Sequence, residues 1–235
     1  RNFTAKPVPT GFSSLDKMMN GGLNKKQLTI LGARPSLGKT TMGQNIILNA
    51  QNRGFDSLFV SLEIDKRQVL LKFLSMMARV DGYKIQTKTY DQSDAQKIIE
   101  AKRQLKEMNL RVNDTCGLDY MKIDEIVRQA KDTGNLDLVL VDYVQIINSI
   151  DARWKNKADL IKEATTHLKQ IAIKYDVAVL ALCQINRQGV QDGKQPSLTD
   201  LKGSGGIEED ADVVIILHRD QAGENESGTY SNDGK

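Results

Sequence analysis

The sequence predicts an α/β fold in which a mostly parallel, twisted sheet carries helices on both faces. Three observations lead to this prediction. Short apolar runs alternate with longer amphipathic stretches, most of the short runs are continuous in Val, Ile and Leu, and a glycine-containing loop joins the first run to a helical pattern. Strands that alternate with helices form parallel sheets, and continuous apolar strands are covered on both faces. Ligands of such sheets bind beyond the carboxyl ends of the strands.

Six apolar runs are predicted to be strands. They span residues 28–31, 58–62, 110–113, 136–147, 177–184 and 212–218. Five stretches are predicted to be helices, at residues 40–51, 66–79, 91–108, 123–131 and 157–175. The third helix opens with Asp91-Gln92-Ser93-Asp94, a typical helix start. In the last helix, apolar residues recur every three or four positions, the period of one buried helix face: Leu160, Ile161, Ala164, Leu168 and Ile171.

The chain is expected to hold one domain, because no repeat or low-complexity linker divides its 235 residues. We place this domain at residues 11–222. Residues 1–10 are expected to be the remnant of an inter-domain linker. Residues 223–235 are rich in Gly, Asn, Ser, Asp and Glu, which predicts a loop or frayed tail. We expect the domain to be truncated before its last strands.

Composition narrows the class of protein. Hydrophobic residues make up 40% and charged residues 27%, which is ordinary for a globular protein. Cys116 and Cys183 are far apart and lack a CxxC spacing, which argues against a disulfide scaffold or zinc site and favours a cytoplasmic location. No apolar run approaches the roughly 18 residues that span a bilayer, so we expect no membrane partner. The net charge of +3 permits a polyanionic partner without requiring one.

A phosphate-binding loop is predicted between the first strand and the first long helix. The run Ala33-Arg34-Pro35-Ser36-Leu37-Gly38-Lys39-Thr40 matches the P-loop pattern except at its first position, where Ala33 replaces glycine. Backbone N–H groups of the loop and the helix N-terminus would hold the phosphates of ATP. Lys39 would contact the β- and γ-phosphates, the Thr40 hydroxyl would ligate Mg²⁺, and Thr41 completes the binding segment. A chance glycine-rich turn is the alternative.

Three further strands end on polar side chains that could serve this site. Asp142 follows four apolar residues and could hold the magnesium shell, or it could simply cap the strand end. Glu63 follows another strand and could accept a proton from the attacking water, or it could be a solvated glutamate. Gln184 could hydrogen-bond the γ-phosphate and lose that partner on hydrolysis. Lys39, Glu63, Asp142 and Gln184 are therefore the candidate catalytic residues.

Together these segments resemble the RecA-like motor domain of the DnaB-type replicative DNA helicases. The resemblance spans about residues 8–220 and includes the P-loop with its alanine and proline, Ser61-Leu62-Glu63, Val141-Asp142-Tyr143-Val144-Gln145, residues 181–187 and residues 201–212. It implies a RecA-like P-loop NTPase fold and a homo-hexameric ring that hydrolyses ATP at subunit interfaces. Such a ring would move 5′ to 3′ on single-stranded DNA and unwind duplex. A helicase loader and a primase would be partners of the full-length protein, in the bacterial cytoplasm or a phage-infected cell.

The resemblance also implies DNA contacts from two segments that would face the channel of the ring. Lysines and small residues let backbone N–H groups approach phosphates, and a motor that binds any sequence needs no base contacts. For the first segment, a solvated charged turn is the alternative. The family's arginine finger would lie beyond the last matching segment, so no finger residue is named. The candidate DNA-binding residues are Arg153, Lys155, Lys157, Lys202, Gly203, Ser204 and Gly205.

Two other functions stay open from the sequence. One is a RecA- or KaiC-like ATPase for recombination or signalling, which would share the P-loop geometry. Residues 201–212 favour the helicase over this alternative. The other is a non-motor module that binds nucleotide to gate an interaction. A protein that only binds nucleotide would have no use for a base at the position of Glu63. Glu63 therefore distinguishes an ATPase from the non-motor module.

Overall fold

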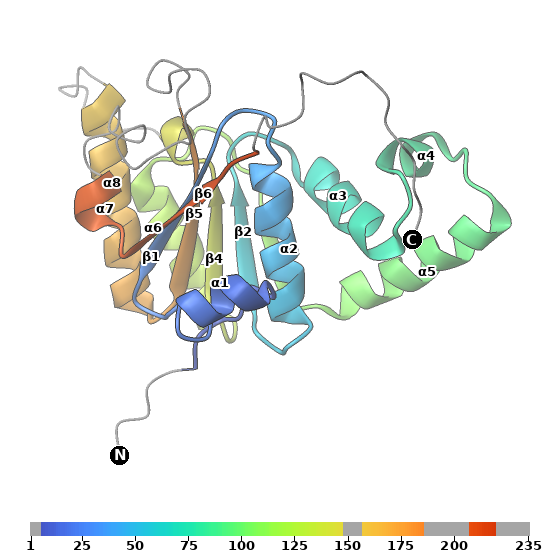
Figure 1. The fold of residues 1–235 in the computed structure, drawn as a ribbon, viewed down its shortest axis with the longest axis horizontal. Coiled ribbons are helices and arrows are strands. Elements are labelled where there is room, and N and C mark those ends of the chain that lie inside the picture. Colours follow the sequence, from blue (N-terminus) through green and yellow to red (C-terminus); the bar gives the residue numbers. More distant parts are fainter. Residues whose placement is uncertain (1–5, 148–156, 186–206, 220–235) are drawn as a thin grey trace.

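The computed structural model describes residues 6–147, 157–185 and 207–219. Its centre is a six-stranded sheet in the order β3-β2-β4-β5-β1-β6, and every neighbouring pair is parallel (Figure 1). The predicted α/β fold with a parallel sheet is confirmed. The strands are β1 Leu28–Ala33, β2 Ser57–Ser61, β3 Leu110–Asn113, β4 Leu138–Asp142, β5 Ala178–Gln184 and β6 Val213–Leu217.

The five predicted helices are present, with bounds within three residues of those predicted. They are α2 Lys39–Gln51, α3 Lys66–Ala78, α5 Gln92–Glu107, α6 Tyr120–Asp132 and α7 Lys157–Tyr175. Three short helices were not predicted, because six residues or fewer carry too few turns for a periodic signal: α1 Ser13–Met18, α4 Gly82–Thr87 and α8 Ile207–Asp210. No helix in the described part of the chain has the length and apolar character needed to cross a membrane.

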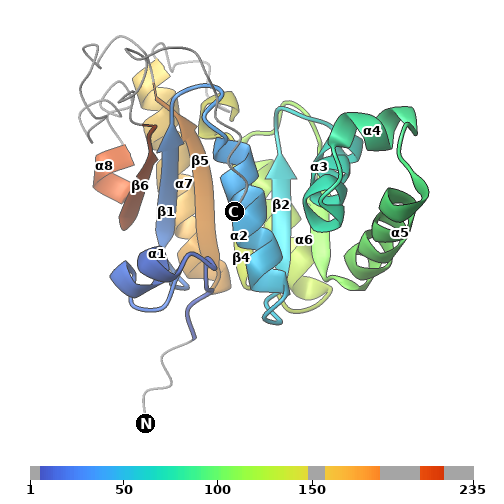
Figure 2. The same ribbon diagram turned by 45° about the vertical axis from the view of Figure 1, so that its right-hand side comes forward.

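Aspartate side chains cap the N-termini of four of these helices, including Asp81 at the start of α4. Asp65, Asp91 and Asp119 precede α3, α5 and α6, and each accepts a hydrogen bond from a backbone N–H in the first turn. Such caps satisfy N–H groups that have no partner inside the helix. Helices α3 and α5 pack on each other and, with α4, extend away from the sheet beyond β2 (Figure 2).

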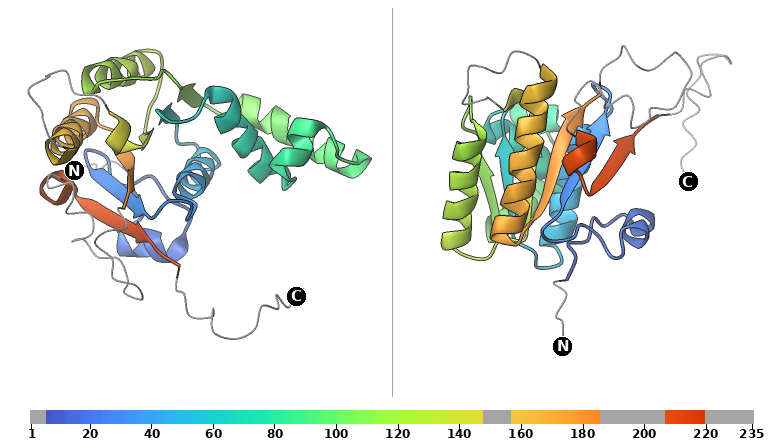
Figure 3. Two further views of the ribbon diagram at one scale, coloured as in Figure 1. Left: turned by 90° about the horizontal axis from the view of Figure 1, so that it is seen from above. Right: turned by 90° about the vertical axis from the view of Figure 1, so that its left-hand side faces the viewer.

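Side chains that alternate between the two faces of the sheet divide the core into two layers. Leu138 and Leu140 of β4 pack in the layer that contains α2 and α3, whereas Val139 and Val141 pack in the layer that contains α6 and α7 (Figure 3). Successive side chains of a strand point to opposite faces. Asp142 therefore points to the same face as Leu140, toward α2. Gln184, two residues after Leu182, points to that face by the same rule.

The fourth predicted strand, residues 136–147, is shorter than predicted. β4 ends at Asp142, the peptide bond between Asp142 and Tyr143 is cis, and Val144–Ile146 forms a 3-10 turn, η1. Val144 and Ile147 are nonetheless buried. Because a buried turn and a buried strand need the same apolar residues, the apolar run could not distinguish them.

Residues 8–10 pack against the folded body, although the sequence places them in a linker. Val8 is fully buried and exchanges two backbone hydrogen bonds with Leu23, at 2.8 and 2.7 Å. Thr10 is also fully buried, and its hydroxyl donates to Asp16 Oδ1 at 2.6 Å. The packed part of the chain therefore begins by Val8.

Candidate nucleotide-binding site

The predicted phosphate loop connects the end of β1 to the start of α2. Ala33 ends β1, residues 34–38 form the loop, and Lys39, Thr40 and Thr41 open α2. Gly38 is the N-cap residue of α2 with φ of 89°. An added Cβ would meet no atom within 4 Å, so the backbone conformation and not the space requires glycine here. Because Gly38 has no side chain that could cap α2, the first N–H groups of this helix are available to an anion.

Asp142 meets the phosphate loop beneath the start of α2. Its side chain is 1% exposed, and its Oδ2 accepts a hydrogen bond from the Thr40 hydroxyl at 2.7 Å. Lys39 Nζ lies 3.5 Å from Oδ1. This position follows from the alternation of β4, which turns Asp142 toward α2. A buried carboxylate is costly unless cations and donors surround it, and Lys39 and Thr40 supply both.

Glu63 lies beside Asp142 because β2 and β4 are neighbours. Ser61 pairs with Asp142 in the sheet, and Leu62 N–H donates to the Asp142 carbonyl at 2.8 Å. The Ser61 hydroxyl donates to the Ile64 carbonyl at 2.5 Å, which closes the turn that carries Glu63. Glu63 itself is exposed at the carboxyl edge of the sheet. Its carboxylate therefore lies one residue beyond the pairing of Leu62 N–H with the Asp142 carbonyl.

Tyr143 forms one wall of this site. Its ring centroid lies 4.2 Å from Lys39 Nζ, a cation–π arrangement. Burial raises the pKa of Tyr143, and the negative charges of Glu63 and Asp142 raise it further. The phenol therefore stays neutral to higher pH than an ordinary tyrosine.

Gln184 ends β5 next to the end of β1. Ala33 pairs with Gln184 in the sheet, and Ile185 N–H donates to the Ala33 carbonyl at 2.9 Å. On its other side, the Gln184 backbone is hydrogen-bonded to the side chain of Gln145. The strand order β2-β4-β5-β1 thus brings Glu63, Asp142, Gln184 and the phosphate loop to one edge, as the sequence predicts.

The chain matches the model of the DnaB-like helicase C terminal domain over residues 7–233. It belongs to this family. Replicative DNA helicase DnaC of Bacillus subtilis is 33% identical to it over 216 residues, which cover 91% of this chain and 47% of that relative. Replicative DNA helicase DnaB of Haemophilus influenzae is 36% identical over 219 residues, which cover 91% of this chain and 46% of that relative. The chain spans about half the length of these relatives.

Two solved structures resemble this DnaB-like domain. One is of a DnaB-like replicative helicase and its interactions with primase, with a TM-score of 0.87, 28% identity and coverage of 95% of this chain and 54% of that chain. The other is described as an ATPase domain, with a TM-score of 0.87, 28% identity and coverage of 97% of this chain and 81% of that chain. The predicted family and the RecA-like fold are confirmed. Membership of the DnaB-like family implies nucleotide use.

The DnaB-like site offers oxygen atoms that suit Mg²⁺. Asp142 Oδ1 is buried and accepts no hydrogen bond from the described residues, and the Thr40 hydroxyl is adjacent. Mg²⁺ prefers such hard oxygen donors, and it usually completes its shell with waters and substrate phosphates. Within residues 6–147, 157–185 and 207–219, no three His, Cys, Asp or Glu side chains could hold a metal by themselves. The residues present therefore fit Mg²⁺ delivered with a nucleotide.

Three residues beside this DnaB-like site lie in the family-matching segments of the sequence but were not named there as site residues. They are Ser61, Tyr143 and Gln145. Gln145 interrupts the apolar run of residues 144–147, and a buried polar group usually needs a partner, so this interruption was a usable signal. Ser61 precedes a turn that serine hydroxyls often close. For Tyr143 the sequence gives no signal beyond its place in the matching segment of residues 141–145.

The predicted DNA contacts of the DnaB-like domain stay predictions. Lys157 is the first residue of α7, but its side chain lies outside the described part. The other candidates also lie outside the described residues: Arg153, Lys155, Lys202, Gly203, Ser204 and Gly205.

Proposed function

We propose that this domain hydrolyses ATP with Mg²⁺ and drives a replicative DNA helicase. The helicase would be a homo-hexameric ring that moves 5′ to 3′ on single-stranded DNA and unwinds duplex. One observation carries the proposal: Lys39, Thr40 and Asp142 meet at the carboxyl edge of the sheet, with Glu63 and Gln184 on the flanking strands. This is the arrangement that phosphoryl transfer needs, because positioning and charge neutralisation supply most of the catalysis.

Each residue has a distinct role in this proposal. The loop of residues 33–38 and the start of α2 bind the phosphates through backbone N–H groups. Lys39, which pairs with Asp142 in the structure, turns to the β- and γ-phosphates. Thr40 and Asp142 hold Mg²⁺, which neutralises phosphate charge when bound. Gln184 contacts the γ-phosphate and loses that contact after hydrolysis.

Glu63 is the proposed base for the attacking water. Its exposed position supports a site that a neighbouring subunit completes, as in a ring with nucleotide between subunits. Its place beside Asp142 keeps it near the phosphates without direct burial. A nucleotide-gated module without turnover would not use this carboxylate.

DNA would pass along the predicted channel segments, through Arg153, Lys155, Lys157 and residues 202–205. A solved relative described with its interactions with primase supports primase as a partner of the full-length protein. A loader and a cytoplasmic location, bacterial or in a phage-infected cell, are part of the same proposal. The family match favours this motor over a RecA- or KaiC-like ATPase.

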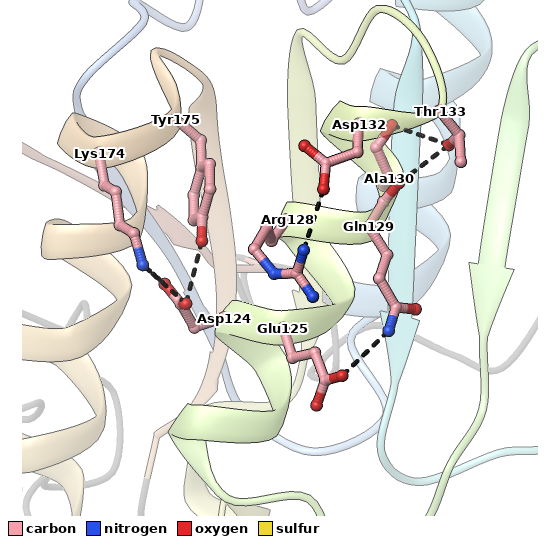
Figure 4. A network of polar contacts seen from close by, with 9 residues as sticks. All are labelled: Asp124, Glu125, Arg128, Gln129, Ala130, Asp132, Thr133, Lys174 and Tyr175. Atoms are coloured by element: carbon pink, nitrogen blue, oxygen red, sulfur yellow. Dashed lines mark hydrogen bonds and ion pairs between the residues drawn. The ribbon is translucent and has the colours of Figure 1, made fainter.

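Substitution of Glu63 by glutamine tests the proposal. Glu63→Gln should lower single-turnover ATP hydrolysis by about 10²- to 10⁴-fold, the usual contribution of a general base. Its affinity for a fluorescent ATP analogue should stay within about threefold, less than 1 kcal/mol. Glu125→Gln is the control, because Glu125 is an α6 carboxylate that pairs with Gln129 and lies outside the site (Figure 4). Unaltered turnover in Glu63→Gln would remove Glu63 from catalysis.

Stimulation by DNA tests the motor part of the proposal. Wild-type ATPase activity should rise with single-stranded DNA of any sequence. The stimulation should weaken steeply between about 50 and 200 mM salt, because phosphate contacts release counterions. If single-stranded DNA does not change the ATPase activity at low salt, the result favours the signalling alternative.

A further inference from the structure

The turn that carries Glu63 is held from both sides by neighbouring strands. On one side, Leu62 N–H donates to the Asp142 carbonyl at the end of β4, at 2.8 Å. On the other side, Lys66 N–H donates to Asp114 Oδ2, directly after β3, at 2.7 Å. Glu63 lies between these two bonds and is exposed. The backbone of the turn, and not the packing of its side chain, therefore determines where the Glu63 carboxylate lies.

Asp114 contacts this turn because β3 and β2 are neighbours. In the sheet Val60 of β2 pairs with Asn113, the last residue of β3. Asp114 is the next residue, so it lies at the carboxyl edge of the sheet. The strand order β3-β2-β4 places it on the side of β2 opposite to Asp142.

The Asp114 carboxylate completes the N-terminus of α3. Lys66 is the first residue of α3, and its N–H has no partner inside the helix. The N-cap residue Asp65 serves a different donor, because its side chain accepts from Gln68 N–H at 2.9 Å. Asp114 supplies the partner for Lys66 and places negative charge at the positive end of the helix dipole. A hydrogen bond to a carboxylate is roughly twice as strong as a neutral one, so the start of α3 is tied firmly to β3.

We propose that Asp114 is a positioning residue that fixes the turn of residues 62–66 and thereby holds the Glu63 carboxylate within reach of the attacking water. This inference rests on the proposed function, in which Glu63 is the base. A base must come within about 2.6–3.2 Å of the proton that it accepts, and a displacement of about 1 Å can cost about 10²-fold in rate. Without Asp114, β3 no longer holds the end of the turn. If Asp114 is only a helix cap, its loss will lower stability and leave hydrolysis unchanged.

Two substitutions of Asp114 in the 235-residue chain test this role. Asp114→Ala removes the hydrogen bond, and we expect single-turnover ATP hydrolysis to fall by roughly tenfold or more. The affinity for a fluorescent ATP analogue should stay within about threefold, because the phosphate loop is untouched. Asp114→Asn keeps an oxygen that can accept from Lys66 N–H. Its hydrolysis rate should therefore stay within about threefold of the wild type.

The same substitution in a Glu63→Gln background shows whether Asp114 acts through Glu63. With the base already removed, Asp114→Ala should change the remaining hydrolysis rate by less than about twofold, because residues that act as a unit are not additive. A general defect of the fold would instead lower the rate by the same factor in both backgrounds.

The matched control is Asp91→Ala. Asp91 makes the same kind of bond at the start of α5, where it accepts from Asp94 N–H at 2.8 Å. This helix extends away from the sheet beyond β2 (Figure 2). Both alanine variants should lower the melting temperature by about 2–4 °C, the usual effect of a lost cap in a chain of this length. Only Asp114→Ala should slow hydrolysis.

Amide hydrogen exchange gives a readout that does not depend on turnover. In the nucleotide-free protein, a peptide that contains residues 62–66 should exchange about fivefold faster in Asp114→Ala than in the wild type, because the turn opens more often. Exchange of this peptide in Asp91→Ala should match that of the wild type.

The outcomes distinguish the two proposals. If Glu63→Gln lowers hydrolysis but Asp114→Ala does not, this inference is overturned and the proposed function stands. An equal loss in both Glu63 backgrounds, an Asp114→Asn variant as slow as Asp114→Ala, or unchanged exchange of residues 62–66 also overturns the inference alone. A wild type without hydrolysis, or a Glu63→Gln variant with normal hydrolysis, overturns the proposed function and this inference with it.

Discussion

The pair of Lys39 and Asp142 should stabilise the fold as well as bind nucleotide. The two side chains are 13% and 1% exposed, and Nζ lies 3.5 Å from Oδ1. The substitution Lys39→Met removes the positive charge and keeps most of the volume. Asp142 then stays buried with a single side-chain hydrogen bond, from Thr40.

The expected cost follows from this geometry. Removing one partner of a buried ion pair costs about 3–5 kcal/mol, because the other charge is left buried. The Thr40 bond keeps part of the stabilisation, since a hydrogen bond to a charged group contributes about 1.5–3 kcal/mol. We therefore expect Lys39→Met to lose about 2–3 kcal/mol. Asp142→Asn should lose about 1–2 kcal/mol, because Lys39 can turn to water.

The double variant decides whether the charges are coupled. With both charges gone, no buried ion lacks a partner, so Lys39→Met with Asp142→Asn should lose only about 1 kcal/mol. The coupling energy would then be about 2–4 kcal/mol, at or above the upper end of the range of about 0.5–3 kcal/mol for residues in contact.

Urea unfolding without nucleotide or Mg²⁺, followed by circular dichroism, measures these energies. Melting should show a decrease of about 4–12 °C for Lys39→Met, at 2–4 °C per kcal/mol for a chain of this length. Lys97→Met is the control, because its ion pair with Asp94 is screened by solvent and should contribute little to stability. Wild-type stability in Lys39→Met, or a double variant that loses the full sum of the single losses, would refute the reasoning.

Two further predictions concern residues around Glu63. Ser61→Ala removes the hydroxyl that closes the turn carrying Glu63. We expect kcat to fall by roughly tenfold with an unchanged KM, and the free energy of unfolding to fall by about 1 kcal/mol. A normal kcat in steady-state kinetics would show that the turn keeps its conformation without Ser61. Tyr143→Phe should change the response to alkaline pH, because the pKa of Tyr143 is raised by burial and by nearby carboxylates. The wild type should lose stability relative to the variant as pH rises from about 10, the unfolded pKa, through the higher folded pKa. Unfolding curves that stay parallel above that pH would contradict this.

Local patterns in the sequence were sufficient to predict the positions of several candidate site residues. The position of a polar residue at the end of an apolar run can be predicted from the sequence, because the carboxyl ends of parallel strands lie at the same edge of the sheet. Asp142, Glu63 and Gln184 were found in this way and lie at that edge beside the P-loop. The five longer helices were found because their apolar residues recur over several turns.

Other features depend on contacts between distant segments. The end of β4 at Asp142 was missed because a buried turn and a buried strand share the same composition. Val8 packs on Leu23 although nothing in its neighbours distinguishes it from a linker residue. The pairing of Gln145 with Gln184 joins residues 39 positions apart.

The sequence by itself determined which chemical groups this DnaB-like domain carries and at which edge of the sheet they lie. Strand periodicity and the P-loop spacing are local properties, so they can be read without knowing the fold. Only the tertiary structure decided which strands are neighbours, and hence that Glu63 lies beside Asp142 and that Gln145 holds Gln184. Strand order is set by the packing of both helical layers at once, and no single segment contains that information.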